Sequence, residues 1–159
     1  MFEIMVCPVK QLYMLACDGD MSDVAAIAVS SYTICEEKLR VFSKKLCLSF
    51  DDITNAAVSS AFTEDKAKQI AEYVKKLPDD LDTLFVCCDS GQSRSSAMAA
   101  AILRYKALDD MRIWKNPKYH PNPLVYKLLC QAFNINVTDE EIDDKIKINE
   151  QAFSKAVGG

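Results

Sequence analysis

One stretch near the middle of the chain joins an apolar run to a helical pattern through a short polar turn. The run from Thr83 to Cys87 has the length of a strand, and nothing polar lies between Leu84 and Cys87. Residues 93–105 carry small side chains first and larger apolar ones later, with no Gly or Pro, as is typical of a helix. The stretch is therefore predicted to form a buried strand, a tight turn and a helix.

The turn carries Cys88, then Gly91, Arg94 and Ser95. Backbone N–H groups in a turn that opens a helix point into one concavity, and the helix dipole adds positive charge there, so the turn is predicted to bind an anion. Gly91 lets the backbone bend where a Cβ would clash, and the planar guanidinium of Arg94 can grip two phosphate oxygens. The same field stabilises a thiolate, so Cys88 is predicted to have a lowered pKa and to be nucleophilic.

The pattern Cys88-x-x-Gly91-x-x-Arg94-Ser95 resembles the signature loop of the cysteine-dependent protein tyrosine and dual-specificity phosphatases. That family usually has His before the nucleophile, where this chain has Cys87. The resemblance implies a fold of the phosphotyrosine protein phosphatases II type, a three-layer α/β/α domain with a four-stranded mixed sheet. It also implies that the Ser95 hydroxyl donates to the Cys88 sulfur and that the loop binds phosphate through Asp89, Ser90, Gly91, Gln92, Ser93 and Arg94.

A phosphatase of this type also needs an acid that protonates the departing oxygen. The related enzymes supply an aspartate from the loop after the preceding strand. Here the predicted strand 46–50 ends in two carboxylates, and the second, Asp52, lies 36 residues before Cys88 (88 − 52). Asp52 is the favoured acid and base, Asp51 is the alternative, and the pair could instead only cap a turn. Two adjacent carboxylates are expected to raise one another's pKa, which would keep one protonated.

The rest of the chain is predicted to alternate strands with helices, which indicates an α/β sandwich. Residues 1–159 show no repeat, linker or low-complexity segment and are expected to form one domain. Thr63 and Thr138 are predicted N-caps of two of the helices. Further strands are expected at 2–9, 25–29 and 46–50, helices at 10–17, 64–77, 124–133 and from 138 to about 156, and irregular segments at 32–40, 53–62 and 109–123.

Composition and charge indicate which kinds of binding partner and which cellular compartment to expect. Half of the residues are hydrophobic and the net charge is −4, with no long basic block, so nucleic acid and anionic membrane surfaces are not expected partners. There is no secretion signal and no apolar stretch of about 18 residues, so no membrane association is expected. Seven cysteines without paired spacing suit a reducing cytoplasm. A single histidine and one adjacent cysteine pair argue against zinc, and no metal or cofactor is expected.

The resemblance predicts hydrolysis of a phosphomonoester through a phosphocysteine at Cys88. The substrate is expected to be a phosphorylated protein or a small phosphomonoester, and inorganic phosphate or sulfate could occupy the loop. Relatives that prefer phosphoinositides carry Lys in the loop, whereas Asp89, Ser90 and Gln92 are acidic or neutral, which favours a monoester with one phosphate. Two alternatives stay open: a catalytically silent phosphate-binding module, and a sulfurtransferase of the rhodanese type.

Two residues near the loop have open roles. Cys87 could trap an oxidised Cys88 in a disulfide, although strand alternation favours a buried side chain that points the other way. His120 lies between prolines and is expected to organise its loop rather than to contact substrate.

Overall fold

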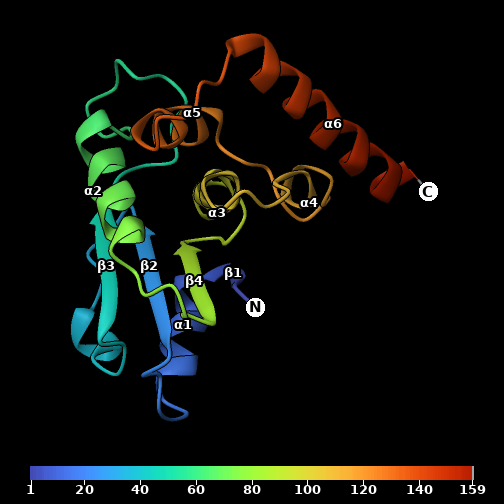
Figure 1. Ribbon diagram of the computed structural model, residues 1–159. Helices are drawn as coiled ribbons and strands as arrows, with labels where there is room; N and C mark the ends of the chain where they lie inside the picture. Colours follow the sequence, from blue (N-terminus) through green and yellow to red (C-terminus); the bar gives the residue numbers. More distant parts are fainter. Residues whose placement is uncertain (159) are drawn as a thin grey trace.

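The fold is built on a sheet of four parallel strands in the order β1-β4-β2-β3 (Figure 1). The computed structural model describes residues 1–158. The elements along the chain are β1 (Glu3–Pro8), α1 (Val9–Ala16), β2 (Val24–Ser30), the 3-10 helix η1 (Glu36–Leu39), β3 (Lys44–Ser49), α2 (Glu64–Lys75), β4 (Thr83–Cys88), α3 (Arg94–Tyr105), α4 (Met111–Trp114), α5 (Pro123–Ala132) and α6 (Asp139–Gly158).

The predicted α/β class and the four-stranded sheet are confirmed, but the prediction of a mixed sheet is wrong. All three pairings, β1 with β4, β4 with β2 and β2 with β3, are parallel. The physical reason is that a helical crossover follows each of the first three strands and returns the chain to the same starting edge. The carboxyl ends of all four strands therefore lie at one edge of the sheet, where the loops that follow them meet.

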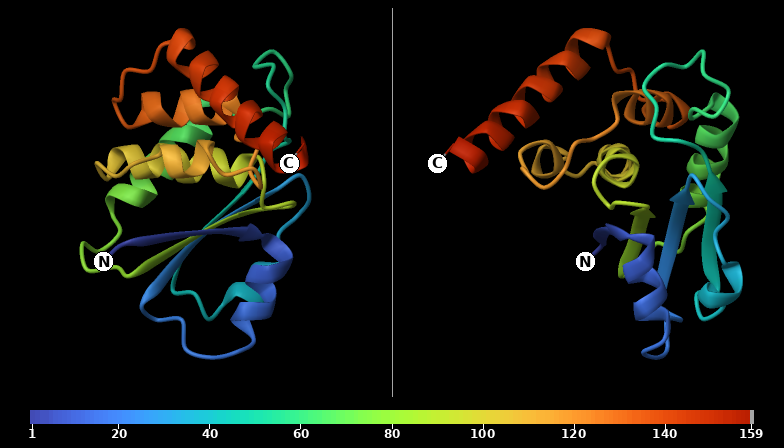
Figure 2. Two further views of the ribbon diagram at one scale, coloured as in Figure 1. Left: turned by 90° about the vertical axis from the view of Figure 1, so that its right-hand side faces the viewer. Right: turned by 180° about the vertical axis from the view of Figure 1, so that it is seen from behind.

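Alternating strand residues build a separate hydrophobic core on each face of the sheet, and Figure 2 shows helices on both sides. On one face, side chains such as Ile27 and Val86 pack with buried residues of α2, α3 and α5 in the larger core. On the other face, Ala28 and Cys87 pack with Leu12 of α1 and with η1 in a smaller core. Neighbouring strand residues thus belong to opposite cores, as the two-residue period of a strand requires.

Most predicted elements are present, with boundaries shifted by one or a few residues. The predicted caps are confirmed: the Thr63 hydroxyl accepts a hydrogen bond from the Lys66 N–H at 3.3 Å, and the Thr138 hydroxyl accepts one from the Glu141 N–H at 3.1 Å. Helix α5 begins one residue earlier than predicted, at Pro123, because Pro is well suited to the first helical position.

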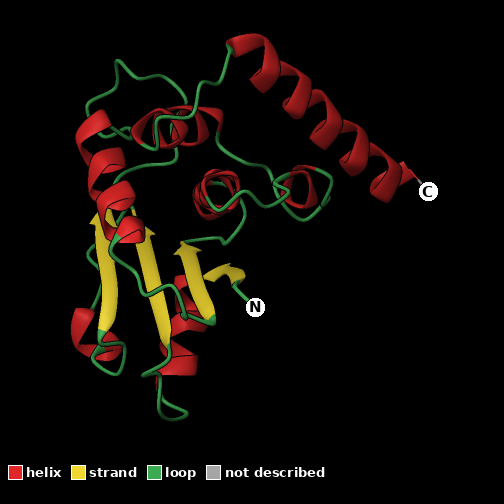
Figure 3. Ribbon diagram, viewed as in Figure 1, coloured by secondary structure: helices red, strands yellow, loops and turns green. Residues whose placement is uncertain are grey.

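Two short helices lie in segments that were predicted to be irregular, η1 within 32–40 and α4 within 109–123 (Figure 3). Each has four residues, which is too short to show a helical period in sequence. Helix α4 is stabilised by distant contacts, since the Asn149 side chain in α6 donates to the Trp114 carbonyl at 2.9 Å. Within residues 1–158, none of the helices has the length and apolar character needed to cross a membrane.

Candidate active site

The loop between β4 and α3 rests on the end of the neighbouring strand β1. Gly91 has a φ of +70°, in the left-handed region that favours glycine. A Cβ on Gly91 would lie 2.6 Å from the Pro8 nitrogen and 2.7 Å from the Cys7 carbonyl carbon. Glycine is therefore required at position 91 for two reasons: the backbone bends there, and the loop lies against the β1 backbone.

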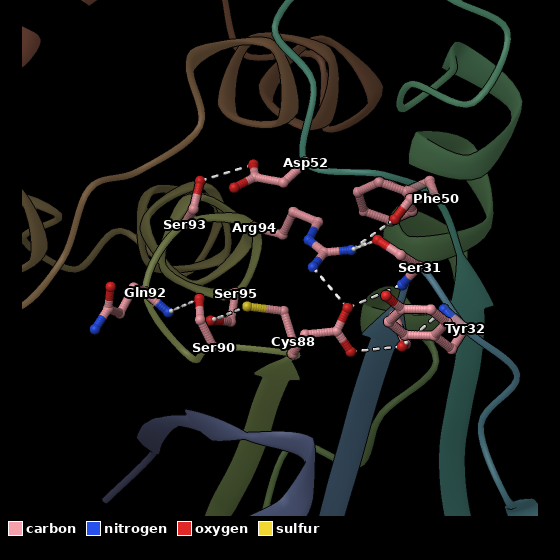
Figure 4. Close-up of polar contacts among 12 residues, drawn as sticks. Ser31, Tyr32, Phe50, Asp52, Cys88, Ser90, Gln92, Ser93, Arg94 and Ser95 are labelled. Atoms are coloured by element: carbon pink, nitrogen blue, oxygen red, sulfur yellow. Dashed lines mark hydrogen bonds and ion pairs between the residues drawn. The ribbon is translucent and has the colours of Figure 1, made fainter.

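Cys88 is the last residue of β4 and is fully buried beneath this loop. Its Sγ lies 3.1 Å from the Ser95 Oγ, a contact that Figure 4 shows in the first turn of α3. Burial alone would raise the pKa of the Cys88 thiol. Hydrogen bonds from the Ser95 hydroxyl and from the backbone N–H groups of Ser95 and Gly91, together with the charge of Arg94, outweigh burial and lower this pKa. The predicted thiolate character of Cys88 therefore has a structural basis.

Arg94 begins α3 and is only 5% exposed, and partners from three other segments hold its guanidinium. Nη1 donates to the Phe50 carbonyl at 2.7 Å and to the Ser31 Oγ at 3.1 Å, and Nη2 donates to the Asp89 Oδ2 at 2.9 Å (Figure 4). Ser31 follows β2 and Phe50 follows β3, so the guanidinium is fixed where the carboxyl ends of these strands meet.

One donor of Arg94 has no partner. Among residues 1–158, the Nε of Arg94 is the one buried side-chain nitrogen or oxygen without a hydrogen bond. Such groups are rare in folded proteins because a buried, unpaired donor loses its hydration without compensation. The charge of the same guanidinium helps to lower the pKa of Cys88, so the free donor belongs to a cation that acts on this thiol.

Asp52 lies at the rim of the loop, on the side of Ser93. Its Oδ1 accepts a hydrogen bond from the Ser93 Oγ at 2.8 Å and one from the Asn122 Nδ2 at 2.7 Å. The backbone N–H of Asn122 also donates to the Ser93 carbonyl at 3.2 Å, so Asn122 ties Asp52 to the loop. Asn122 was not predicted as a site residue, although the sequence carries a signal for it: Asn directly before a Pro that opens a helix is an N-cap pattern.

Asp51 faces other partners. Hydrogen bonds from the Ser60 and Ser31 hydroxyls lower the pKa of Asp51. The expected rise in pKa is thus wrong for Asp51, because these hydrogen bonds and the charge of Arg94 outweigh the opposing effects of burial and of the Asp89 charge. Of the two carboxylates, Asp52 is the one bonded to the loop.

Comparisons with known proteins identify the fold. Protein-family models and curated proteins gave no match. Among solved structures, the Cydia pomonella PTP-2 phosphatase aligns with a TM-score of 0.56 at 17% identity, over 81% of this chain and 84% of that chain. The Yvh1 phosphatase domain from Chaetomium thermophilum aligns with a TM-score of 0.55 at 17% identity, over 84% and 92%. The chain has a protein tyrosine phosphatase-like fold. The resemblance to the phosphatases that the loop sequence indicated is therefore confirmed at the level of the fold.

Cys87 packs on the face of the sheet opposite to that of Cys88. Cys87 lies in the smaller core, and its Sγ is 3.1 Å from the Sγ of Cys7, its register partner on β1. This thiol contact lowers the pKa of Cys7, and the same contact together with burial raises the pKa of Cys87. Cys88 belongs to the opposite core. The thiol next to Cys87 is therefore that of Cys7 rather than that of Cys88.

The segment around His120 is hydrogen-bonded to the loop between β4 and α3. The backbone N–H of His120 donates to the Gln92 carbonyl at 3.0 Å, and its ring packs edge-on against Phe153 with centroids 5.2 Å apart. Ser90 acts within the loop, where its Oγ accepts from the Gln92 N–H at 3.3 Å. Within residues 1–158 there is no group of three or more His, Cys, Asp or Glu side chains that could hold a metal ion.

Proposed function

We propose that this protein is a phosphomonoester hydrolase that acts through a phosphocysteine at Cys88. The observation that carries the proposal is the pairing of a buried thiol of lowered pKa with the unpartnered Arg94 Nε on the same loop. The phosphatase-like fold of the chain supports this proposal. The phosphate oxygens would bind to the guanidinium of Arg94 and to the backbone N–H groups of residues 89–94.

The reaction would proceed in two displacements. The Cys88 thiolate attacks phosphorus and forms the S–P bond as the ester O–P bond breaks, and Asp52 gives its proton to the departing oxygen. Asp52 then accepts a proton from water, whose oxygen attacks phosphorus and breaks the S–P bond. The Ser95 hydroxyl, 3.1 Å from the sulfur, would stabilise the thiolate as it leaves.

The substrate class follows from the charge of the loop. Apart from Arg94, the loop residues 89–95 carry no cationic side chain, and Asp89 is acidic. We therefore infer a substrate with a single phosphate, on a protein or a small molecule, rather than a highly charged inositol phosphate. The seven cysteines are all free, which suits a reducing compartment such as the cytoplasm.

The experiment that tests this function is hydrolysis of p-nitrophenyl phosphate by purified wild-type protein and three variants. Cys88→Ser is expected to abolish turnover, and Asp52→Asn is expected to lower kcat by about 10²–10⁴-fold, the usual contribution of general acid–base catalysis. Asp51→Asn is the matched control and should retain most of the activity. Full turnover by Cys88→Ser would overturn the proposal. A wild-type protein that binds phosphate but never hydrolyses the ester would indicate the silent binding module instead.

A further inference from the structure

Asp89 places a carboxylate inside a loop that is built to bind anions. Its side chain is 35% exposed, and that of its partner Arg94 is 6% exposed. A free carboxylate at this position would repel a phosphate. In the structure, however, the carboxylate is hydrogen-bonded to Ser30, the last residue of β2, and to Ser31, which follows it.

The carboxylate of Asp89 joins the end of β2 to the first residue of α3 through three groups. Oδ1 accepts a hydrogen bond from the Ser30 Oγ at 2.5 Å. Oδ2 accepts one from the Ser31 N–H at 3.0 Å and one from the Arg94 Nη2 at 2.9 Å. Burial would raise the pKa of Asp89, but the donors Ser30, Ser31 and Arg94 outweigh burial and lower it. Asp89 is therefore ionised at neutral pH, and its pair with Arg94 persists.

The contacts of Arg94 determine which of its donors stay free. A guanidinium has five N–H groups. Two on Nη1 go to Phe50 and Ser31, and one on Nη2 goes to Asp89. The N–H of Nε and the second N–H of Nη2 remain, and these adjacent groups form one edge of the planar fork, which suits two oxygens of one oxyanion.

We propose that Asp89 is a positioning residue that orients Arg94, so that the Nε and Nη2 edge of the guanidinium is presented to the oxyanion. This inference rests on the proposed function, because it assigns to Asp89 the orientation of the phosphate-binding arginine. The carboxylate of Asp89 acts through Arg94 and does not itself touch the substrate. The geometry of the carboxylate matters more than its charge, since the role is to accept hydrogen bonds at fixed positions.

The test measures binding of tungstate, a tetrahedral dianion, to the full chain by titration calorimetry, which needs no turnover. Asp89→Ala should weaken binding about tenfold, the effect expected when a hydrogen bond to a charged group is lost. Asp89→Asn should stay within about threefold of the wild type, because its amide can accept from Arg94 and Ser31 and donate to Ser30. If Asp89→Ala does not fold by circular dichroism, Asp89→Ser replaces it, since serine is too short to reach Arg94.

A double-mutant cycle with Arg94→Ala separates positioning from general damage to the loop. Adding Asp89→Ala to Arg94→Ala should cause no further loss of tungstate binding. Three results would overturn the inference: wild-type affinity in Asp89→Ala, the same additional loss in the Arg94→Ala background, or a loss in Asp89→Asn as large as that in Asp89→Ala. The proposed function fails on a different result, turnover by Cys88→Ser, so the two failures are distinguishable.

Discussion

Two ion pairs of the molecule, Lys145–Asp110 and Arg94–Asp89, each contain a buried cation, and among residues 1–158 it is Arg94 that keeps a buried nitrogen without a partner. In the helical layer, Lys145 Nζ lies 3.1 Å from the Asp110 Oδ2, which also accepts from the Tyr126 hydroxyl at 2.7 Å and the Trp114 Nε1 at 3.2 Å. In the loop, Arg94 pairs with Asp89 at 2.9 Å, but the Nε of Arg94 has no partner.

This difference separates a structural pair from a binding pair. The Asp110 carboxylate collects donors from α4, α5 and α6 and thereby fixes three helices to one another, with both charged side chains at most 10% exposed. The Arg94 pair is equally buried on the arginine side, yet it keeps a donor that a folded protein would normally satisfy. Under the proposed function, burial of charge is common to both pairs, and the unsatisfied donor is what distinguishes the phosphate-binding pair from the structural one.

The largest expected effect is on stability. Asp110→Ala should lower the free energy of unfolding by about 3–5 kcal/mol, because it leaves the Lys145 ammonium buried without a counter-charge. Urea denaturation measures this loss, and kcat/KM should be unchanged at a temperature where the variant is folded. Asp143→Ala, at an exposed position on α6, is the control and should change the free energy of unfolding by less than about 0.5 kcal/mol. Equal effects of the two variants would contradict a structural role for Asp110.

The next effect is on activity. Arg94→Lys should lower kcat/KM by about 10²–10³-fold, since a lysine cannot offer two parallel donors to an oxyanion. Arg104→Lys is the matched control within the same helix, because Arg104 lies near the opposite end of α3 from the loop and pairs with Glu141. This variant should retain activity. If both substitutions reduced p-nitrophenyl phosphate hydrolysis to the same extent, the contrast between a binding and a structural cation would be lost.

The smallest expected effect is a change in pH dependence. The pKa of Cys88 is lowered, so its thiolate forms at a lower pH than that of an ordinary thiol. The difference in thiolate ultraviolet absorbance between wild type and Cys88→Ser, followed against pH, reports this titration. Ser95→Ala should move the midpoint upward, toward that of an ordinary thiol, because it removes a donor that stabilises the thiolate. A midpoint that stays in place would show that Ser95 does not tune the sulfur.

The sequence was most informative where structure is determined locally. The strand, turn and helix around Cys88 lie within about twenty residues, and the period of the helix and the position of Gly91 both follow from neighbours in the chain. The caps Thr63 and Thr138 were predictable for the same reason. Local patterns were sufficient to predict the turn between β4 and α3 and the α/β class of the fold.

Features that depend on distant partners were not predictable in this way. The parallel direction of β3 depends on the crossover that contains η1, and these four residues are too few to show a helical period in the sequence. The role of Asp89 depends on Ser31, 58 residues away, and Asn122 meets Asp52 over 70 residues. A single sequence gives the identity of such residues but not the contacts that define their roles.

The support of Gly91 by the Pro8 backbone has a consequence for synthesis of the chain. Cys7 and its register partner Cys87 are 80 residues apart, so β1 has no partner strand until β4 has left the ribosome. A nascent chain that ends before residue 83 carries its first strand unpaired, and one that ends before residue 94 also lacks Arg94. The surroundings of the Cys88 thiol can therefore be completed only after all four strands have been translated.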